Sequence, residues 1–202
     1  MHSEFWDRRY STDDYLYGEL PNEFLAEMVT LLVPNGSVFV PGDGEGRNGV
    51  WLARKGFDVT TVDSSVQGVE KARSLAARHG VGLLQTVADL STWEYPKATF
   101  DAAVLIYLHL PESIRLRVHQ QIASSLKPGG IVIVECFHPQ QLNRNSGGPK
   151  DISMLYDCDL LRSDFKDLLT PHFEYEGNVL LAEGAGHSGL GYVSRWVGSK
   201  TA

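Results

Sequence analysis

The apolar residues of the chain fall into short runs that alternate with segments of helical spacing. Five runs predict strands: Ser37–Pro41, "FDVTTVD" from Phe57, "GLLQTV" from Gly82, "FDAAVLIY" from Phe100 and "IVIVEC" from Ile131. The last two runs are almost uniformly apolar, which is typical of strands buried on both faces of a parallel sheet. Regular alternation of strand and helix predicts βαβ units with right-handed crossovers.

Capping residues delimit the helices between these strands. Serine is a favoured N-cap, proline is favoured in the first turn, and glycine commonly ends a helix. Three helices are expected: from about Gly46 to Lys55, from Ser64 or Ser65 to Gly80, and from Pro111 to the "KPGG" that begins at Lys127. The polar stretch "QQLNRNSGGPKD" after Pro139 is long enough to suggest a lid or a binding loop, and a short helix is expected near Leu160 to Leu169.

The last part of the chain has a different pattern. "EYEGNVLLAEG" and "GLGYVSRWV" alternate like half-exposed strands, and the glycine-rich "EGAGHSG" joins them, which predicts an antiparallel hairpin. We therefore predict a Rossmann-like, doubly wound α/β sheet of seven strands, mostly parallel with a C-terminal antiparallel hairpin. Ligands of such sheets bind beyond the carboxyl ends of the strands. Without repeats or a linker, residues 1–202 are expected to form one domain, with 1–36 as an N-terminal lid or helical segment and 37–202 as the core.

Charge and composition exclude several classes of function. The net charge of −7, with scattered basic residues, argues against a nucleic-acid partner, because that affinity needs clustered Lys and Arg. The two cysteines, Cys136 and Cys158, lack metal-ligand spacing, so we expect no metal site and reduced thiols in a cytoplasmic protein. The longest apolar stretch, "AAVLIYLHL" from Ala102, is shorter than the roughly 20 residues that cross a bilayer, so no membrane association is expected. The oligomeric state is left open.

The stretch "VFVPGDGEGRNGVWLA" from Val38 contains two overlapping glycine motifs. Gly44, Gly46 and Gly49 fit the dinucleotide fingerprint, whereas Gly42, Gly44 and Gly46 fit a nucleoside loop of another kind. Both ligands contain a ribose, and both suit Asp63 at the end of the second strand as the acid that binds it. The glycines and the acid therefore leave both ligands open.

Other features favour S-adenosylmethionine over a dinucleotide. The carboxylates of Asp43, Glu45 and Asp63 would crowd a pyrophosphate, whereas a sulfonium and an ammonium tolerate them. Asp89, in the "ADL" after the third strand, could accept a hydrogen bond from an adenine amino group. No tyrosine is followed four residues later by lysine, so the usual proton relay of a short-chain dehydrogenase is missing.

The order and spacing of "GDGEG", "VDSS", "ADL" and "LKPGG" resemble the class I S-adenosylmethionine-dependent methyltransferases over essentially the whole chain. More narrowly, "GEGRN", "FWDRRY", "HLP" and "GGPKD" resemble the tellurite-resistance methyltransferases, which are distantly similar to thiopurine methyltransferases. The resemblance implies transfer of a methyl group to a small molecule such as a thiol or a tellurium or selenium oxyanion, leaving S-adenosylhomocysteine. The sequence departs from the family at Val40 and Pro41, where an acid is common, so the methionyl ammonium must be held by backbone carbonyls or another side chain.

The expected site residues fall into three groups. The cofactor-binding group is Gly42, Asp43, Gly44, Gly46, Asp63, Ser64, Asp89, Leu90 and Ile106. The candidate catalytic bases are His109 and His187, although His109 could equally be a structural residue near the helix that follows Pro111. The acceptor-binding or lid group is Trp6, Tyr10, Tyr17, Tyr107, Phe137 and His138, of which the N-terminal aromatics could instead only staple that segment to the core. The alternatives to a methyltransferase are a non-catalytic S-adenosylmethionine-binding module and, less favoured, a nicotinamide-dependent oxidoreductase.

Overall fold

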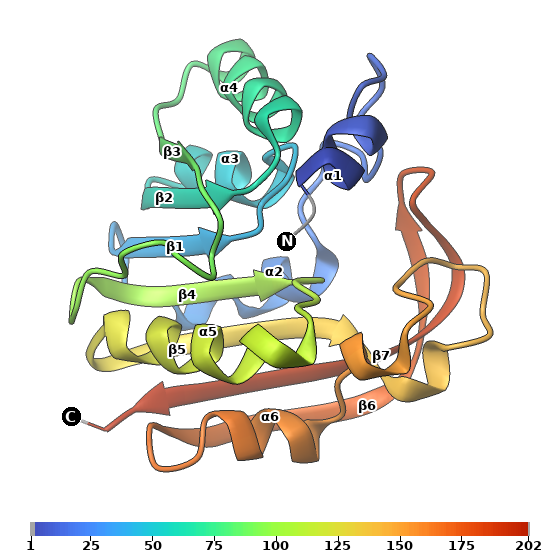
Figure 1. Ribbon diagram of the computed structural model, residues 1–202. Helices are drawn as coiled ribbons and strands as arrows, with labels where there is room; N and C mark the ends of the chain where they lie inside the picture. Colours follow the sequence, from blue (N-terminus) through green and yellow to red (C-terminus); the bar gives the residue numbers. More distant parts are fainter. Residues whose placement is uncertain (1–2, 202) are drawn as a thin grey trace.

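The computed structural model describes residues 3–201 and is built around one seven-stranded sheet (Figure 1). Its strands are β1 (Ser37–Pro41), β2 (Asp58–Asp63), β3 (Leu84–Val87), β4 (Phe100–Ile106), β5 (Leu126–Phe137), β6 (Leu169–Glu183) and β7 (His187–Lys200). Their order across the sheet is β3-β2-β1-β4-β5-β7-β6. Strands β1 to β5 pair in parallel, whereas β7 is antiparallel to both β5 and β6. The predicted fold class is confirmed.

Helices cover both faces of the sheet. They are α1 (Ser3–Arg9), α2 (Glu23–Met28), α3 (Arg47–Arg54), α4 (Val66–His79), α5 (Glu112–Ser125) and α6 (Cys158–Asp164), with short 3-10 turns η1 (Val29–Leu31), η2 (Pro139–Gln141) and η3 (Ile152–Met154). Alternate side chains of each strand point to opposite faces. Phe39 and Leu105 therefore join the core with α5 and α6, while Val38 and Val104 join the core with α2 and α3.

Several element boundaries differ from those predicted, and two of them change the assignment of a segment. The short helix α6 ends at Asp164, and Leu169, which was expected in the helix, begins β6. The "KPGG" segment does not simply end a helix: β5 begins at Leu126, opposite Phe100, and pairs again from Ile131, opposite Ala102. Residues 127–130 therefore loop out of the ladder, which the positive φ of Gly129 (+78°) allows.

The helix α4 has a serine cap at its start and a glycine at its end. Ser65 caps the helix by accepting a hydrogen bond from the Gly68 N–H at 3.0 Å, and Gly80 ends it at φ +66°. The N-terminus of α4 therefore lies directly after the carboxyl end of β2, beside α1.

Within residues 3–201, no helix is both long enough and apolar enough to span a bilayer.

Candidate functional site

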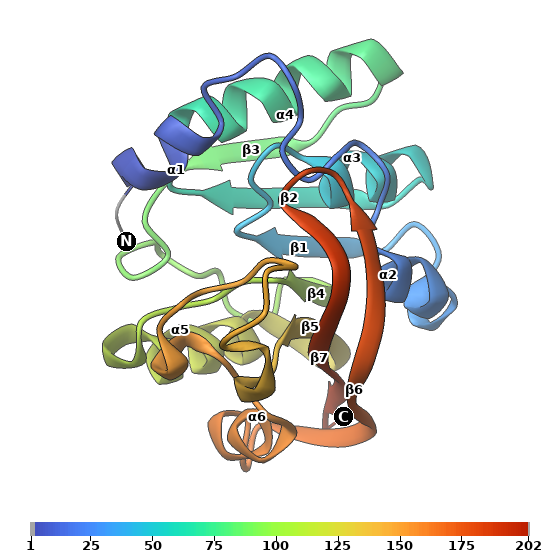
Figure 2. The same cartoon turned by 90° about the vertical axis from the view of Figure 1, so that its right-hand side faces the viewer.

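A cavity of about 580 Å³ lies at the carboxyl ends of β1, β4 and β5. It is enclosed by α1, the loop between β5 and α6, and the tip of the β6–β7 hairpin, all of which surround this edge of the sheet (Figure 2). The volume is in the range of small-molecule sites. This is the edge at which doubly wound sheets bind ligands.

Two glycines of the loop after β1 line the cavity in conformations that favour glycine. Gly42 has φ +69°, and a Cβ there would lie 2.7 Å from the Leu108 side chain. Gly44 has φ +56°, and a Cβ there would lie 2.6 Å from the Tyr10 hydroxyl. Both positions therefore require glycine, because a side chain would be strained by the positive φ and would collide with Leu108 or Tyr10.

The third glycine of the motif has a different role. Gly46, at φ +91°, does not line the cavity, and a Cβ there would lie 2.8 Å from the Ala72 backbone in α4. It lets α3 approach α4 closely. The expectation that Gly46 contacts the cofactor is thus not supported by its position, because Gly46 lies outside the cavity lining.

Asp63 lines the cavity and is 9% exposed. One carboxylate oxygen accepts the Gly44 N–H at 2.9 Å and the other accepts the Ser65 N–H at 2.8 Å. Burial raises the pKa of Asp63, and the two backbone hydrogen bonds oppose that rise. Each oxygen retains a further lone pair, so this acid can hold the loop and still accept a hydrogen bond from a ligand hydroxyl.

Ser64 and Arg47 supply polar groups that lack partners. The Ser64 hydroxyl and the Nη1 of Arg47 are buried, and neither has a hydrogen-bond partner among the described residues. Both residues line the cavity. Since buried polar groups are nearly always hydrogen-bonded, these two are the clearest sign that a polar ligand belongs here.

The other two acids of the predicted cluster are used largely within the protein. The Asp43 carboxylate accepts the Gly49 N–H at 3.2 Å, and burial raises its pKa to about 7. Glu45 accepts the Leu16 N–H at 2.8 Å and pairs with the Lys71 ammonium at 2.5 Å. Both residues border the cavity, but these contacts fasten α3 and the N-terminal segment.

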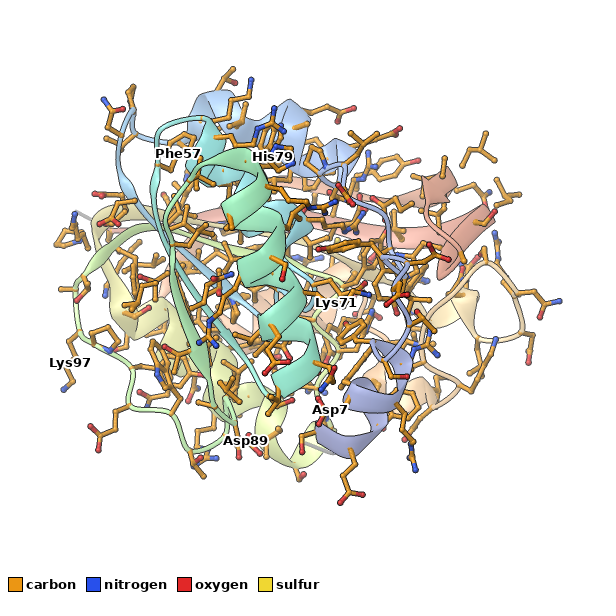
Figure 3. The ribbon with its side chains drawn as sticks, turned by 90° about the horizontal axis from the view of Figure 1, so that it is seen from above. Asp7, Phe57, Lys71, His79, Asp89 and Lys97 are labelled. Carbon is orange, nitrogen blue, oxygen red and sulfur yellow. The ribbon has the colours of Figure 1, made fainter. Side chains whose placement is uncertain are left out.

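The predicted adenine residues lie away from the cavity lining. Leu90 is 2% exposed and belongs to the core on the α5 side of the sheet, whereas Ile106 does line the cavity. Asp89 accepts the Ser91 N–H at 2.7 Å, and Figure 3 shows it at the same end of the molecule as Asp7 of α1. Contact of Asp89 with adenine stays a prediction.

The N-terminal aromatics form one wall of the cavity. Trp6 stacks on Tyr10 with ring centroids 5.5 Å apart, and Tyr17 lies next to the hairpin tip. The Arg9 guanidinium sits 5.7 Å from the Phe5 and Trp6 ring centroids. Arg9 thus already places a cation against two of these rings, an arrangement that aromatic faces favour.

His109 lines the cavity, but both of its ring nitrogens are engaged. Nδ1 lies 2.5 Å from the Met154 carbonyl oxygen, and Nε2 accepts the Phe137 N–H at 3.2 Å. Burial lowers the pKa of His109 to about 4. With no lone pair left to take a proton from a ligand, His109 is placed as a wall residue, which corrects its expected role as a base.

His187 also lines the cavity, and only one of its ring nitrogens is engaged. Nδ1 lies 3.2 Å from an Oε2 oxygen of Glu183, across the tip of the hairpin. The ring packs against Tyr17, Tyr107 and Phe137 at centroid distances of 4.4, 4.3 and 5.1 Å. These three predicted lid residues therefore gather around His187.

His138, expected in the same group, lies elsewhere. Its Nδ1 accepts the Gln140 N–H at 3.0 Å, and its Nε2 lies 3.5 Å from Glu176 in a separate hollow beside Cys158. Because successive residues of a strand point to opposite sides, Phe137 and His138 cannot both face the cavity. In the part of the chain that the structure describes, no cluster of His, Cys, Asp or Glu could hold a metal.

A buried polar network beneath the cavity was missed from sequence. Glu135, 1% exposed, accepts hydrogen bonds from the Tyr107 hydroxyl and the Asn22 amide, both at 2.7 Å, and pairs with Arg195. The Asn22 amide also donates to Glu183 at 2.9 Å. A glutamate inside the apolar run "IVIVEC" was a signal that could have been followed, because a buried charge needs partners.

The seven-stranded sheet, with its ligand cavity at the carboxyl edge, defines a Rossmann-like methyltransferase fold. A family model described as "Methyltransferase domain" matches residues 38–130, which include the glycine loop and Asp63. A search of curated proteins finds no significant sequence match.

Solved structures match the whole fold. A structure described as "Conversion of a Disulfide Bond into a Thioacetal Group during Echinomycin Biosynthesis" gives a TM-score of 0.80 at 18% identity over 100% of this chain and 92% of that one. A SAM-dependent methyltransferase from Methanosarcina mazei gives a TM-score of 0.70 at 17% identity, covering 87% of this chain and 97% of that one. TehB from Haemophilus influenzae gives a TM-score of 0.72 at 15% identity, covering 98% of this chain and 67% of that one. These neighbours share the fold of this chain.

Proposed function

We propose that the protein is an S-adenosylmethionine-dependent methyltransferase that acts on a small molecule in the cytoplasm. The observation that supports this most is the continuity of the cavity, which joins the glycine loop and Asp63 to the aromatic compartment around His187. One space thus offers a nucleoside end and an acceptor end. Its enclosure favours a small acceptor over nucleic acid, in keeping with the negative net charge.

The groups in the cavity fit this cofactor. Asp63 and the unpartnered Ser64 hydroxyl suit ribose hydroxyls, and Gly42 and Gly44 line the cavity beside them. The unpartnered Nη1 of Arg47 suits the methionyl carboxylate. Because Val40 and Pro41 end β1 without an acid, we assign the methionyl ammonium to backbone carbonyls of the loop or another side chain.

The acceptor that we propose is a thiol or a tellurium or selenium oxyanion. Support comes from the motif resemblance to the tellurite-resistance group and from the structural neighbour described as converting a disulfide bond. When bound, S-adenosylmethionine supplies a methyl group activated by its sulfonium. The protein's part is to align the acceptor and exclude water, which can lower a barrier by about 7 to 11 kcal/mol.

Two measurements test this function. S-adenosylhomocysteine should raise the Tm, because a ligand that binds only the folded state stabilises it, whereas NAD should do little. Labelled S-adenosylmethionine should then transfer its methyl group to at least one member of a panel of thiols, selenium and tellurium oxyanions, amines and phenols. Binding without turnover would favour a non-catalytic binding module, and a larger Tm shift with NAD would favour an oxidoreductase.

A further inference from the structure

Glu183 fixes which nitrogen of His187 carries a proton. A neutral imidazole has one donor and one acceptor nitrogen, and the hydrogen bond made by one nitrogen decides the role of the other. Nδ1 faces the Glu183 carboxylate at 3.2 Å, so it is the donor. Nε2 therefore carries a lone pair, and no hydrogen bond to Nε2 is found among residues 3–201.

Glu183 is itself held in place as an anion. The Asn22 amide donates to one of its oxygens at 2.9 Å, and Arg47 pairs with the other at 3.0 Å. Burial would raise the pKa of Glu183, but His187 and Arg47 outweigh it and hold that pKa at about 2. The carboxylate that orients His187 is thus charged throughout the neutral range and fixed from two sides.

His187 is itself neutral in this setting. The charged or titratable side chains that act on it are Glu183, Arg47, Arg9 and His109, and the Tyr17 and Tyr107 rings pack against it. Burial lowers the pKa of His187, Glu183 opposes that shift, and the two arginines add to it. A neutral histidine with an open Nε2 at the wall of a cavity has the state required of a general base.

We propose that the acceptor enters the cavity as a protonated weak acid, a thiol in particular, that Nε2 of His187 accepts its proton, and that Glu183 is the positioning residue. This rests on the proposed function. It also assigns the acceptor class. An oxyanion, or a thiolate that has already formed, would need no base, and the pair of His187 and Glu183, here called the dyad, would then take no part in the reaction.

The step balances within the cavity. The acceptor's S–H proton goes to Nε2 of His187, and the acceptor's electron pair forms the new bond to the methyl carbon. The bond from that carbon to the donor sulfur breaks, with its electron pair left on the sulfur. His187 ends as an imidazolium paired with Glu183 and returns its proton to solvent after product leaves.

The first test needs no acceptor. Nitrogen-detected NMR of the full chain should show His187 with Nδ1 protonated and Nε2 unprotonated at pH 7.5, with and without S-adenosylhomocysteine. In Glu183→Gln the pKa of His187 should fall further, because the imidazolium loses its counter-ion. A proton on Nε2, or an unchanged His187 pKa in Glu183→Gln, would overturn the proposal.

The second test compares 2-mercaptoethanol, protonated at pH 7.5, with thiophenol, largely ionised at that pH. His187→Gln should lower kcat about 10²- to 10⁴-fold with the aliphatic thiol and far less with thiophenol. Glu183→Gln should cost about 10- to 100-fold, the range for carboxylates that orient metal-bound histidines, and should move the acidic limb of the kcat/KM profile to lower pH. His138→Gln changes a buried histidine of the separate hollow and is the matched control. It should change neither kcat nor the pH profile of kcat/KM.

The outcomes separate the two proposals. Equal losses with both thiols, or no loss in His187→Gln, would overturn the dyad while leaving the methyltransferase standing. If the parent protein turns over only oxyanions, the acceptor class assigned here is wrong. Failure of the parent protein to bind S-adenosylhomocysteine would instead overturn the proposed function.

Discussion

Asp7 of α1 accepts a 2.6 Å hydrogen bond from the hydroxyl of Ser65, the N-cap residue of α4, and a second one from the Gln67 N–H at 3.1 Å. Figure 3 shows Asp7 at this end of α4, with Lys71 about halfway along the helix. Lys71 adds a second tie, donating to the Thr12 and Asp14 carbonyls. The aromatic wall of the cavity is therefore fastened to the helix that follows Asp63.

The first prediction concerns this tie. Asp7→Ala should speed backbone hydrogen exchange in residues 3–10 and raise both the on-rate and the off-rate for S-adenosylhomocysteine, because α1 separates more readily from α4. The loss in global stability should stay near 1 kcal/mol, the usual net contribution of a hydrogen bond, because Ser65 still caps α4. Asp13→Ala, in the exposed part of the same segment, is the control. Unchanged exchange in residues 3–10 would show that the aromatic packing alone holds α1.

The second prediction concerns Asp63. Asp63→Ala should weaken S-adenosylhomocysteine binding by about 1.5 to 3 kcal/mol, the range for hydrogen bonds to a charged group. The structure adds a loss of stability, because the Gly44 and Ser65 N–H groups lose their acceptor. Asp63→Asn should keep part of both effects. Calorimetry that shows reduced stability with unchanged affinity would mean that Asp63 only holds the loop.

How much of this site the sequence could predict depends on how local each interaction is. Ser65 caps α4 through a hydrogen bond to a residue only three positions later, and Gly42 and Gly44 turn the chain directly after β1. Sequence spacing alone therefore located these three residues. The assignment of Gly46 to the cofactor failed because its neighbour, Ala72, belongs to another helix. Sequence spacing cannot show what faces an open Cα position.

The histidines show the same limit at longer range. Nothing near His109 in the sequence indicates that Met154 and Phe137 occupy its two nitrogens. Glu183 lies only four residues before His187, but the sequence pattern placed His187 in the loop of the hairpin, so the pairing of these two residues across the tip was not predicted. Nor was the Asn22–Glu135 bond, which joins residues 113 apart along the chain.

The third prediction concerns the pH dependence of stability through Asp43. Its pKa is raised by burial from 3.8 to about 7, so the folded protein keeps a proton that the unfolded chain has released. This group therefore contributes a stability loss as pH rises from about 4 to about 7, by up to about 1.4 kcal/mol per pH unit. Asp43→Asn should remove this loss. In urea unfolding, the free energy of unfolding of the variant should therefore rise relative to that of the parent over this pH range, and the difference should stay constant at higher pH. Asp58→Asn, an exposed residue, should give a curve parallel to that of the parent; a parallel curve for Asp43→Asn as well would contradict the prediction.

The fourth prediction separates a structural from a chemical role for Tyr107, which was expected to contact the acceptor. Its backbone has φ +52°, and its N–H donates to the Glu135 carbonyl at 2.7 Å. Its hydroxyl donates to the Glu135 carboxylate, also at 2.7 Å, so the hydroxyl points into the buried network while the ring packs against His187.

Tyr107→Phe keeps the ring beside His187 and removes only the hydroxyl, leaving Glu135 with Asn22 and Arg195 as partners. We expect the free energy of unfolding to fall by about 1.5 to 3 kcal/mol, because a hydrogen bond to a buried charge is lost. Affinity for S-adenosylhomocysteine and kcat should change little. Tyr175→Phe, which removes an exposed hydroxyl, should leave stability nearly unchanged and serves as the control. A large fall in kcat at unchanged stability would mean that the Tyr107 hydroxyl leaves Glu135 and acts on the acceptor.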